Sequence, residues 1–133
     1  MKLLTYAFLG ALALQPMTAT TAAAVETIQT SYVNLSEVTS QKTTTRSVEN
    51  ALKTCSSARG WRFSRVAPGK LLGKLTVRGK HYVEVDVEFS SQAFKISYRD
   101  SKNMKYNAAK NTIHKRYNSW VENLTNDVIF CLK

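Results

Sequence analysis

Between residues 71 and 98, apolar residues alternate with polar ones at a period of two. This period is typical of strands that bury one face and expose the other. The predicted buried face carries Leu75, Val77, Val83, Val85, Val87, Phe89, Phe94, Ile96 and Tyr98. The opposite face carries Glu84, Asp86, Glu88, Lys95, Ser97 and Arg99. The segment therefore predicts an antiparallel meander with one apolar side.

The two faces also predict how the strands pair. A hairpin with Ser91 and Gln92 at its tip keeps apolar residues opposite apolar ones and charges opposite charges. Its predicted pairs are Val87 with Ile96, Val85 with Tyr98, Glu88 with Lys95 and Glu84 with Arg99. The preceding turn, at 78–81, must hold an odd number of residues to keep Val77 and Val83 on one face. We expect that turn to place Lys74 opposite Asp86.

Helical periodicity flanks the strands on both sides. Residues 47–58 carry apolar residues at helical spacing, and Gly60 is expected to end that helix. A short strand follows at 61–66, and Pro68-Gly69 predicts a turn. A second helix is expected at 107–128, with an apolar stripe of Ile113, Tyr117, Trp120, Val121, Leu124 and Val128. The sequence thus predicts an α+β two-layer sandwich: helix, three- or four-stranded antiparallel meander, then C-terminal helix, with both helices on one sheet face.

The N-terminal segment is typical of a secretory signal peptide. Lys2 precedes an apolar run at 3–14, and small residues end at Ala24, after which we expect cleavage. The run is too short to span a bilayer, which takes ~20 apolar residues. We divide the chain into a signal peptide at 1–24, a flexible linker or edge segment at 25–45, and a single α+β domain at 46–133. The expected location is periplasmic or secreted.

Export changes how the two cysteines are interpreted. Cys55 and Cys131 are the only cysteines, and disulfides form and persist outside the reducing cytosol. We therefore expect a structural disulfide between them. The spacing does not match a metal-binding or C-x-x-C redox motif.

Composition bounds the function. The chain has 133 residues, with 19 Lys and Arg against 9 Asp and Glu, and a formal net charge of +10. Five basic residues fall between Asp100 and Glu122 with no acid among them: Lys102, Lys105, Lys110, Lys115 and Arg116. The favoured interpretation is a basic surface that only keeps the protein in solution, and the alternative is a patch that attracts polyanions. The candidate partners are an anionic envelope polymer, lipid headgroups or another envelope protein, and nucleic acid is the least available partner for an exported chain.

Few residues indicate catalysis. Glu84, Asp86 and Glu88 form a row of carboxylates on one strand, but basic or hydroxyl residues face them, which favours a solvated charge ladder. We predict no catalytic residue, no metal site and no cofactor. The alternative is a small periplasmic hydrolase or thiol enzyme using His114 with a carboxylate or a cysteine. His81, in a predicted turn, is expected to be a surface residue.

A set of short motifs resembles a family of small, uncharacterised exported proteins and lipoproteins of Gram-negative bacteria. They are Arg59-Gly60-Trp61, Pro68-Gly69, Arg78-Gly79 with His81, Tyr98-x-Asp100-Ser101-x-Asn103, Tyr106, Ile113-His114, and Tyr117-Asn118-x-Trp120-Val121 with Leu124. The resemblance covers about residues 47–128 and implies an envelope location and a compact α+β domain, but no reaction. Many members carry a cysteine at the cleavage site, which this chain lacks, and Lys80 lengthens the turn before His81.

The polar residues of these motifs suggest a ligand site. Asp100, Ser101 and Asn103 follow a predicted strand, where such side chains often satisfy turn N–H groups. The alternative is a small polar pocket at the strand end, which these three residues form with Tyr106, His114 and Asn118 from the facing helix. Binding sites often occupy loops on a rigid scaffold. These six residues are our candidate ligand site, in a non-catalytic binding or structural module.

Overall fold

The computed structural model describes residues 24–133, so the predicted signal peptide, except for its last residue Ala24, lies outside the described residues. The elements in chain order are β1 (Val25–Thr27), β2 (Ser31–Asn34), α1 (Leu35–Val38), α2 (Thr45–Thr54), the 3₁₀ helix η1 (Ser57–Arg59), β3 (Arg62–Ala67), β4 (Lys70–Val77), β5 (His81–Phe89), β6 (Ala93–Lys102), β7 (Thr112–His114) and α3 (Arg116–Leu132). The expected α+β class is confirmed.

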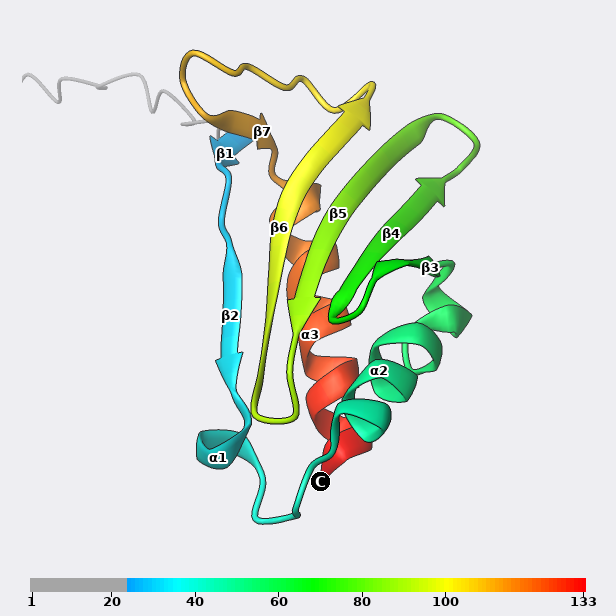
Figure 1. Ribbon diagram of the computed structural model, residues 1–133. Coiled ribbons are helices and arrows are strands. Elements are labelled where there is room, and N and C mark those ends of the chain that lie inside the picture. Colours follow the sequence, from blue (N-terminus) through cyan, green and yellow to red (C-terminus); the bar gives the residue numbers. More distant parts are fainter. Residues whose placement is uncertain (1–23) are drawn as a thin grey trace, which may run out of the picture.

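The main sheet is antiparallel and has the strand order β2-β6-β5-β4-β3. Its last four strands form the predicted meander. The strand β2, from the segment at 25–45, adds a fifth strand beside β6, and β1 pairs separately with β7. In Figure 1, α3 crosses behind the sheet and α2 lies beside it, below β3 and β4, while the front face of the sheet is open.

The core lies between the sheet and these two helices. The predicted apolar face of the sheet is buried there, with Val83, Val85 and Ile96 fully inaccessible. Val48 and Leu52 of α2 and Leu124 and Val128 of α3 are also fully buried. The remaining stripe residues of α3 follow the prediction, except that Trp120 is only partly buried.

The hairpin register is confirmed near its tip and wrong farther from it. Val87 pairs with Ile96 and Val85 with Tyr98, as predicted, but Glu84 lies opposite Asp100 rather than Arg99. The cause is a β-bulge in which Arg99 is the extra residue. Arg99 still reaches Glu84 as an ion pair, with Nε 3.7 Å from Oε2.

The β4–β5 turn also differs from the prediction. Lys74 lies opposite Glu84, not Asp86, because the turn holds three residues, Arg78, Gly79 and Lys80. The predicted odd number is therefore correct, but the register moves by two positions. Arg78 and Gly79 both adopt positive φ, of 56° and 65°, which permits so tight a connection.

The predicted first helix is shorter than expected and starts earlier. A capping box in which Thr44 and Ser47 bond to each other's backbone N–H begins α2 at Thr45. The helix ends at Thr54, and η1 continues to Gly60, whose φ of 103° terminates it as predicted.

The predicted second helix begins nine residues too early. Residues 107–114 form a tight turn and strand β7, in which the Asn107 side chain accepts from the Lys110 N–H and Asn111 adopts a φ of 53°. These asparagines stabilise a turn that competes with helix. Ile113 is buried, as its position in the apolar stripe suggested, but it belongs to β7.

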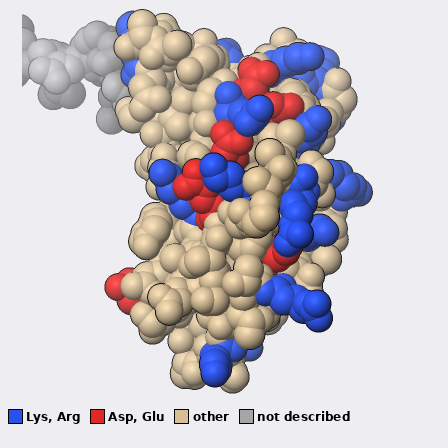
Figure 2. Space-filling view, in the orientation of Figure 1, with Lys and Arg blue, Asp and Glu red and all other residues tan. Residues whose placement is uncertain are grey.

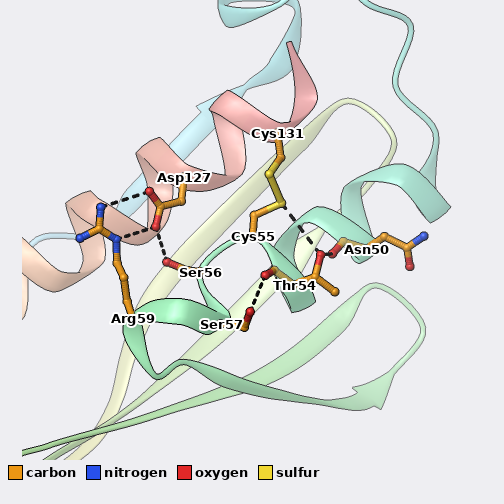
Figure 3. Close-up of a disulfide and its surroundings, with 8 residues drawn as sticks. All are labelled: Asn50, Thr54, Cys55, Ser56, Ser57, Arg59, Asp127 and Cys131. Carbon is orange, nitrogen blue, oxygen red and sulfur yellow. Dashed lines mark hydrogen bonds and ion pairs between the residues drawn. A yellow bond between two sulfur atoms is a disulfide. The ribbon is translucent and has the colours of Figure 1, made fainter.

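The predicted disulfide joins Cys55 and Cys131 and ties the end of α2 to the last turn of α3 (Figure 3). Beside it, Asp127 accepts from the buried Ser56 hydroxyl at 2.6 Å and pairs with Arg59 Nε at 2.6 Å. These bonds, led by that from Arg59, hold the pKa of Asp127 below its usual value. The two cysteines of the chain are bonded to each other, so the thiol-enzyme alternative has no thiol here.

Candidate functional site: a basic pocket at one end of the sheet

A pocket of about 220 Å³ opens at the end of the sheet where the β4–β5 turn meets the start of α3. Its polar lining consists of Arg78, His81, His114 and Arg116. Its apolar lining consists of Val77, Met104 and Trp120. Both histidines of the chain are therefore in one cavity, together with two arginines.

Side-chain to backbone bonds fix the turn that carries His81. His81 Nδ1 donates to the Asn103 carbonyl at 2.9 Å, and Asn103 Nδ2 donates to the Lys80 carbonyl at 2.8 Å. Asn103 has a φ of 57°, a conformation that asparagine tolerates better than most residues. The turn before β5 and the loop after β6 are thus joined at the pocket.

His114 enters the pocket from β7. Its backbone N–H donates to the Met104 carbonyl at 2.7 Å, and its ring Nδ1 accepts from the Arg116 backbone N–H at 3.1 Å. The ring centroids of His81 and His114 are 6.3 Å apart. Residues from three separate segments of the chain therefore converge on the same cavity.

The backbone partners fix how the two rings are protonated. A carbonyl can only accept, so His81 Nδ1 carries a proton. A backbone N–H can only donate, so His114 Nδ1 carries none and its Nε2 holds the proton of the neutral ring. His114 is thus a neutral N–H donor.

The electrostatic environment of the pocket is positive. Burial, followed by the nearby charges of Lys105, His81, Arg116 and Lys115, lowers the pKa of His114. Within residues 24–133, no Asp or Glu side chain lines the pocket. The helix α3 begins at Arg116, and the positive end of its dipole adds to this field; only the first N–H of the helix has a side-chain partner among the described residues, the His114 ring. Such a cavity favours an anion.

The five predicted basic-patch residues surround this end of the molecule. Lys102 ends β6, Lys105 and Lys110 lie in the β6–β7 loop, and Lys115 and Arg116 begin α3; all five are exposed. Arg78 and Lys80 of the β4–β5 turn add two more exposed cations. None of the five ion pairs found within residues 24–133 uses any of these seven side chains.

The ion-paired acids lie elsewhere, and two of them neutralise cations of the open sheet face. Glu84 and Asp86 flank Arg99, whose Nη1 is 2.9 Å from Asp86 Oδ1, and Lys74 Nζ lies 3.8 Å from Glu84. Glu88 pairs in register with Lys95. In Figure 2 the acidic side chains of this face alternate with basic ones. The predicted carboxylate row is therefore part of a charge ladder, and no group of three or more potential metal ligands occurs among residues 24–133.

The six predicted ligand-site residues do not form one pocket. His114 lines the cavity, and Asn103 lies behind it, bonded to His81. Asp100 bonds to the Ser101 backbone N–H. Ser101 bonds instead to the Tyr98 hydroxyl at 2.9 Å, and Tyr106 stacks on the Tyr98 ring with centroids 4.6 Å apart.

Asn118 does not line the basic pocket but lies beside the segment between β1 and β2. Its side chain accepts from the Gln29 N–H at 3.1 Å and donates to the Thr27 carbonyl at 2.9 Å, so it anchors the segment between β1 and β2. It also donates to Glu26 Oε2 at 3.1 Å. The Asn118 side-chain amide therefore holds the N-terminal segment against α3.

His81, Arg78 and Trp120 line the pocket but were not predicted as site residues. His81 was expected at the surface because it follows a turn, but it is only partly exposed. A usable signal was present: the turn after β4 and the loop after β6 must lie at the same end of an antiparallel sheet. That rule brings Arg78 and His81 next to Asn103 and the residues that follow it.

Comparisons with protein-family models, curated proteins and solved structures found no match. Within residues 24–133, no helix is long and apolar enough to cross a membrane. The pocket and its charges are therefore the features that bear on function.

Proposed function

We propose that this protein is a non-catalytic, exported binding module that holds an anionic component of the bacterial envelope at its basic end. One observation carries the proposal: a cavity is lined by Arg78, His81, His114 and Arg116, and the charges of the exposed Lys105 and Lys115 also act on His114. The ion-paired acids of the described chain lie elsewhere. Cations that are not used in ion pairs remain available for a ligand.

The histidine hydrogen bonds support binding over catalysis. A general base at Nε2 of His114 would need a lone pair there, but the bond from the Arg116 N–H uses Nδ1 as the acceptor and leaves the proton on Nε2. A general acid would need a protonated ring, which the surrounding cations and burial disfavour. His114 is better suited to donate one hydrogen bond to an anion.

Vesicle sedimentation tests the binding function. The protein should co-sediment with vesicles containing phosphatidylglycerol and not with phosphatidylcholine alone, and binding should weaken steeply as salt rises from 50 to about 500 mM, because screening shortens the Debye length from about 13 Å to about 4 Å. Equal binding to both vesicles, or binding unaffected by salt, would contradict the proposal.

A matched pair of variants separates a local patch from net charge. Lys105→Gln with Lys110→Gln removes two charges at the basic end, whereas Arg46→Gln with Lys53→Gln removes two exposed charges from α2. Only the first pair should reduce vesicle binding, by about tenfold. Equal losses would mean that net charge alone drives binding.

Two further measurements test export and the lack of catalysis. Protein recovered from the periplasmic fraction of a bacterial host should have the intact mass of residues 25–133. In the alternative hydrolase, His114→Gln would abolish cleavage of p-nitrophenyl esters and phosphates. We expect no turnover above background in either the original protein or this variant.

A further inference from the structure

A second, more apolar cleft lies between β4 and α3 and shares two lining residues with the basic pocket. This cleft has a volume of about 330 Å³ and is lined by Arg59, Trp61, Leu75, Val77, Trp120 and Asn123. Val77 and Trp120 line both cavities. The cleft lies farther along both elements: its lining adds Leu75 on β4 and Asn123 on α3 to the shared Val77 and Trp120.

The cleft exists because the sheet narrows at this point. Strand β3 pairs with β4 only as far as Lys74, which lies opposite Arg62. Leu75 and Val77 therefore have no paired strand on that side, and the side of α3 that carries Trp120 is left uncovered. Trp61, which precedes β3 and is 1% exposed, closes the far part of the cleft.

The charges along these two cavities are asymmetric. At the pocket end, Arg78 and Arg116 have no ion-pair partner among residues 24–133. At the cleft end, Arg59 is neutralised by Asp127 at 2.6 Å. A ligand that fits both cavities is anionic at one end and apolar along the rest.

We propose that the ligand is a single-chain anionic amphiphile. Its acidic headgroup binds between Arg78, His81, His114 and Arg116, and its alkyl chain lies over Trp120 toward Trp61 and Leu75. This assignment rests on the proposed anion-binding function and names the ligand class for that same site. The two cavities together reach the size of small-molecule sites, which span about 300–1,000 Å³.

The two tryptophans of the chain provide the assay, because both line the cleft. Dodecyl phosphate, titrated below its micelle-forming concentration, should change the tryptophan fluorescence saturably. Each fully buried methylene contributes about 0.8 kcal/mol, or about fourfold in affinity. Since the cleft is open on one side, we expect octyl phosphate to bind at least tenfold more weakly.

Two further probes separate the head from the chain. Dodecyl maltoside has the same tail with an uncharged head, and inorganic phosphate has the charge without the tail. Both should bind at least tenfold more weakly than dodecyl phosphate. Equal binding of the maltoside would overturn the assignment of the headgroup to the basic pocket.

Variants with matched controls locate the two parts. Asn123→Phe fills the cleft and should weaken dodecyl phosphate at least tenfold, whereas Asn126→Phe, at an exposed position of the same helix, should not. Arg78→Gln should weaken both alkyl phosphates, and Arg46→Gln on α2 neither. Circular dichroism of each variant confirms that it is folded.

The outcomes separate this inference from the proposed function. If anionic vesicles bind but alkyl phosphates show no dependence on chain length and no effect of Asn123→Phe, the amphiphile assignment is wrong and the proposed function stands. If neither vesicles nor alkyl phosphates bind, both are wrong.

Discussion

Removing the disulfide tests how strongly the C-terminal helix is held by its covalent link. The bond between Cys55 and Cys131 closes a loop with a sequence separation of 76 residues. For such a loop, the chain-entropy model gives about 4.5 kcal/mol of stabilisation at 25 °C, as an upper value. A domain of this size has a total stability of about 5–15 kcal/mol, so the bond accounts for a large share of it.

The change should act mainly on the unfolded chain, because other contacts keep the helix end in place. Leu132 is buried, and its carbonyl accepts from the Thr39 hydroxyl at 3.0 Å. In the double variant Cys55→Ala with Cys131→Ala, the native helix should therefore persist while the unfolded state gains freedom.

Urea unfolding measures this effect. We expect the double variant to lose about 3–4.5 kcal/mol in the free energy of unfolding, with an m-value equal to or larger than that of the oxidised protein. The original protein in reductant should behave in the same way, which excludes an effect of the alanines. A loss below about 1 kcal/mol would refute the reasoning and indicate an unfolded state that is compact without the bond.

Three other predictions test single side chains. Tyr117→Phe should raise the free energy of unfolding in urea by about 0.5–2 kcal/mol, because the Tyr117 hydroxyl is buried with no hydrogen-bond partner among the described residues. As a control, Tyr98→Phe should lower it, because that variant loses the bond to Ser101. Gly73→Ala should cost about 1–3 kcal/mol, since a Cβ there would lie 2.8 Å from Val85 Cγ2. The pKa of His114 is lowered in the folded state, so its contribution to stability is complete above pH 6.5 and is lost as the pH falls. His114→Gln should therefore make the free energy of unfolding depend less on pH below 6.5. An unchanged pH dependence would contradict this.

Periodicity predicted those parts of the fold in which burial alone decides the structure. The apolar faces of β5 and β6 and the stripe of α3 are where period-two and helical spacing placed them, because a shift of one residue would expose a whole face. The disulfide was predicted for a simpler reason: two cysteines allow one intramolecular pairing.

The predictions were wrong where the local backbone departs from a regular helix or strand. The early start of the last helix was wrong because Asn107 and Asn111 stabilise a turn before Ile113. The register error at Glu84 came from a bulge at Arg99, and no property of that residue alone distinguishes a bulge from regular strand. Hydropathy patterns do not record either effect.

Only that part of the candidate site whose residues are close in sequence was predicted. The five basic residues from Lys102 to Arg116 were recognisable as a cluster because they are close in sequence. The pocket needed His81 and His114, which are 33 positions apart in the chain. They meet because both bond to the loop after β6, His81 to the Asn103 carbonyl and His114 to the Met104 carbonyl. Contacts of this kind depend on tertiary structure.

The basic side chains of the described residues fall into two groups: those that form ion pairs within the protein and those that do not. Arg59, Arg65, Lys74 and Arg99 are in ion pairs with acids of the described chain, and these pairs join segments distant in sequence. The seven exposed cations of the basic end take part in none of those pairs. Like charges gathered at one end of a molecule repel one another, and an anionic ligand offsets that repulsion. Solubility alone does not require such a cluster, since exposed charges spread over the surface would keep the protein in solution equally well.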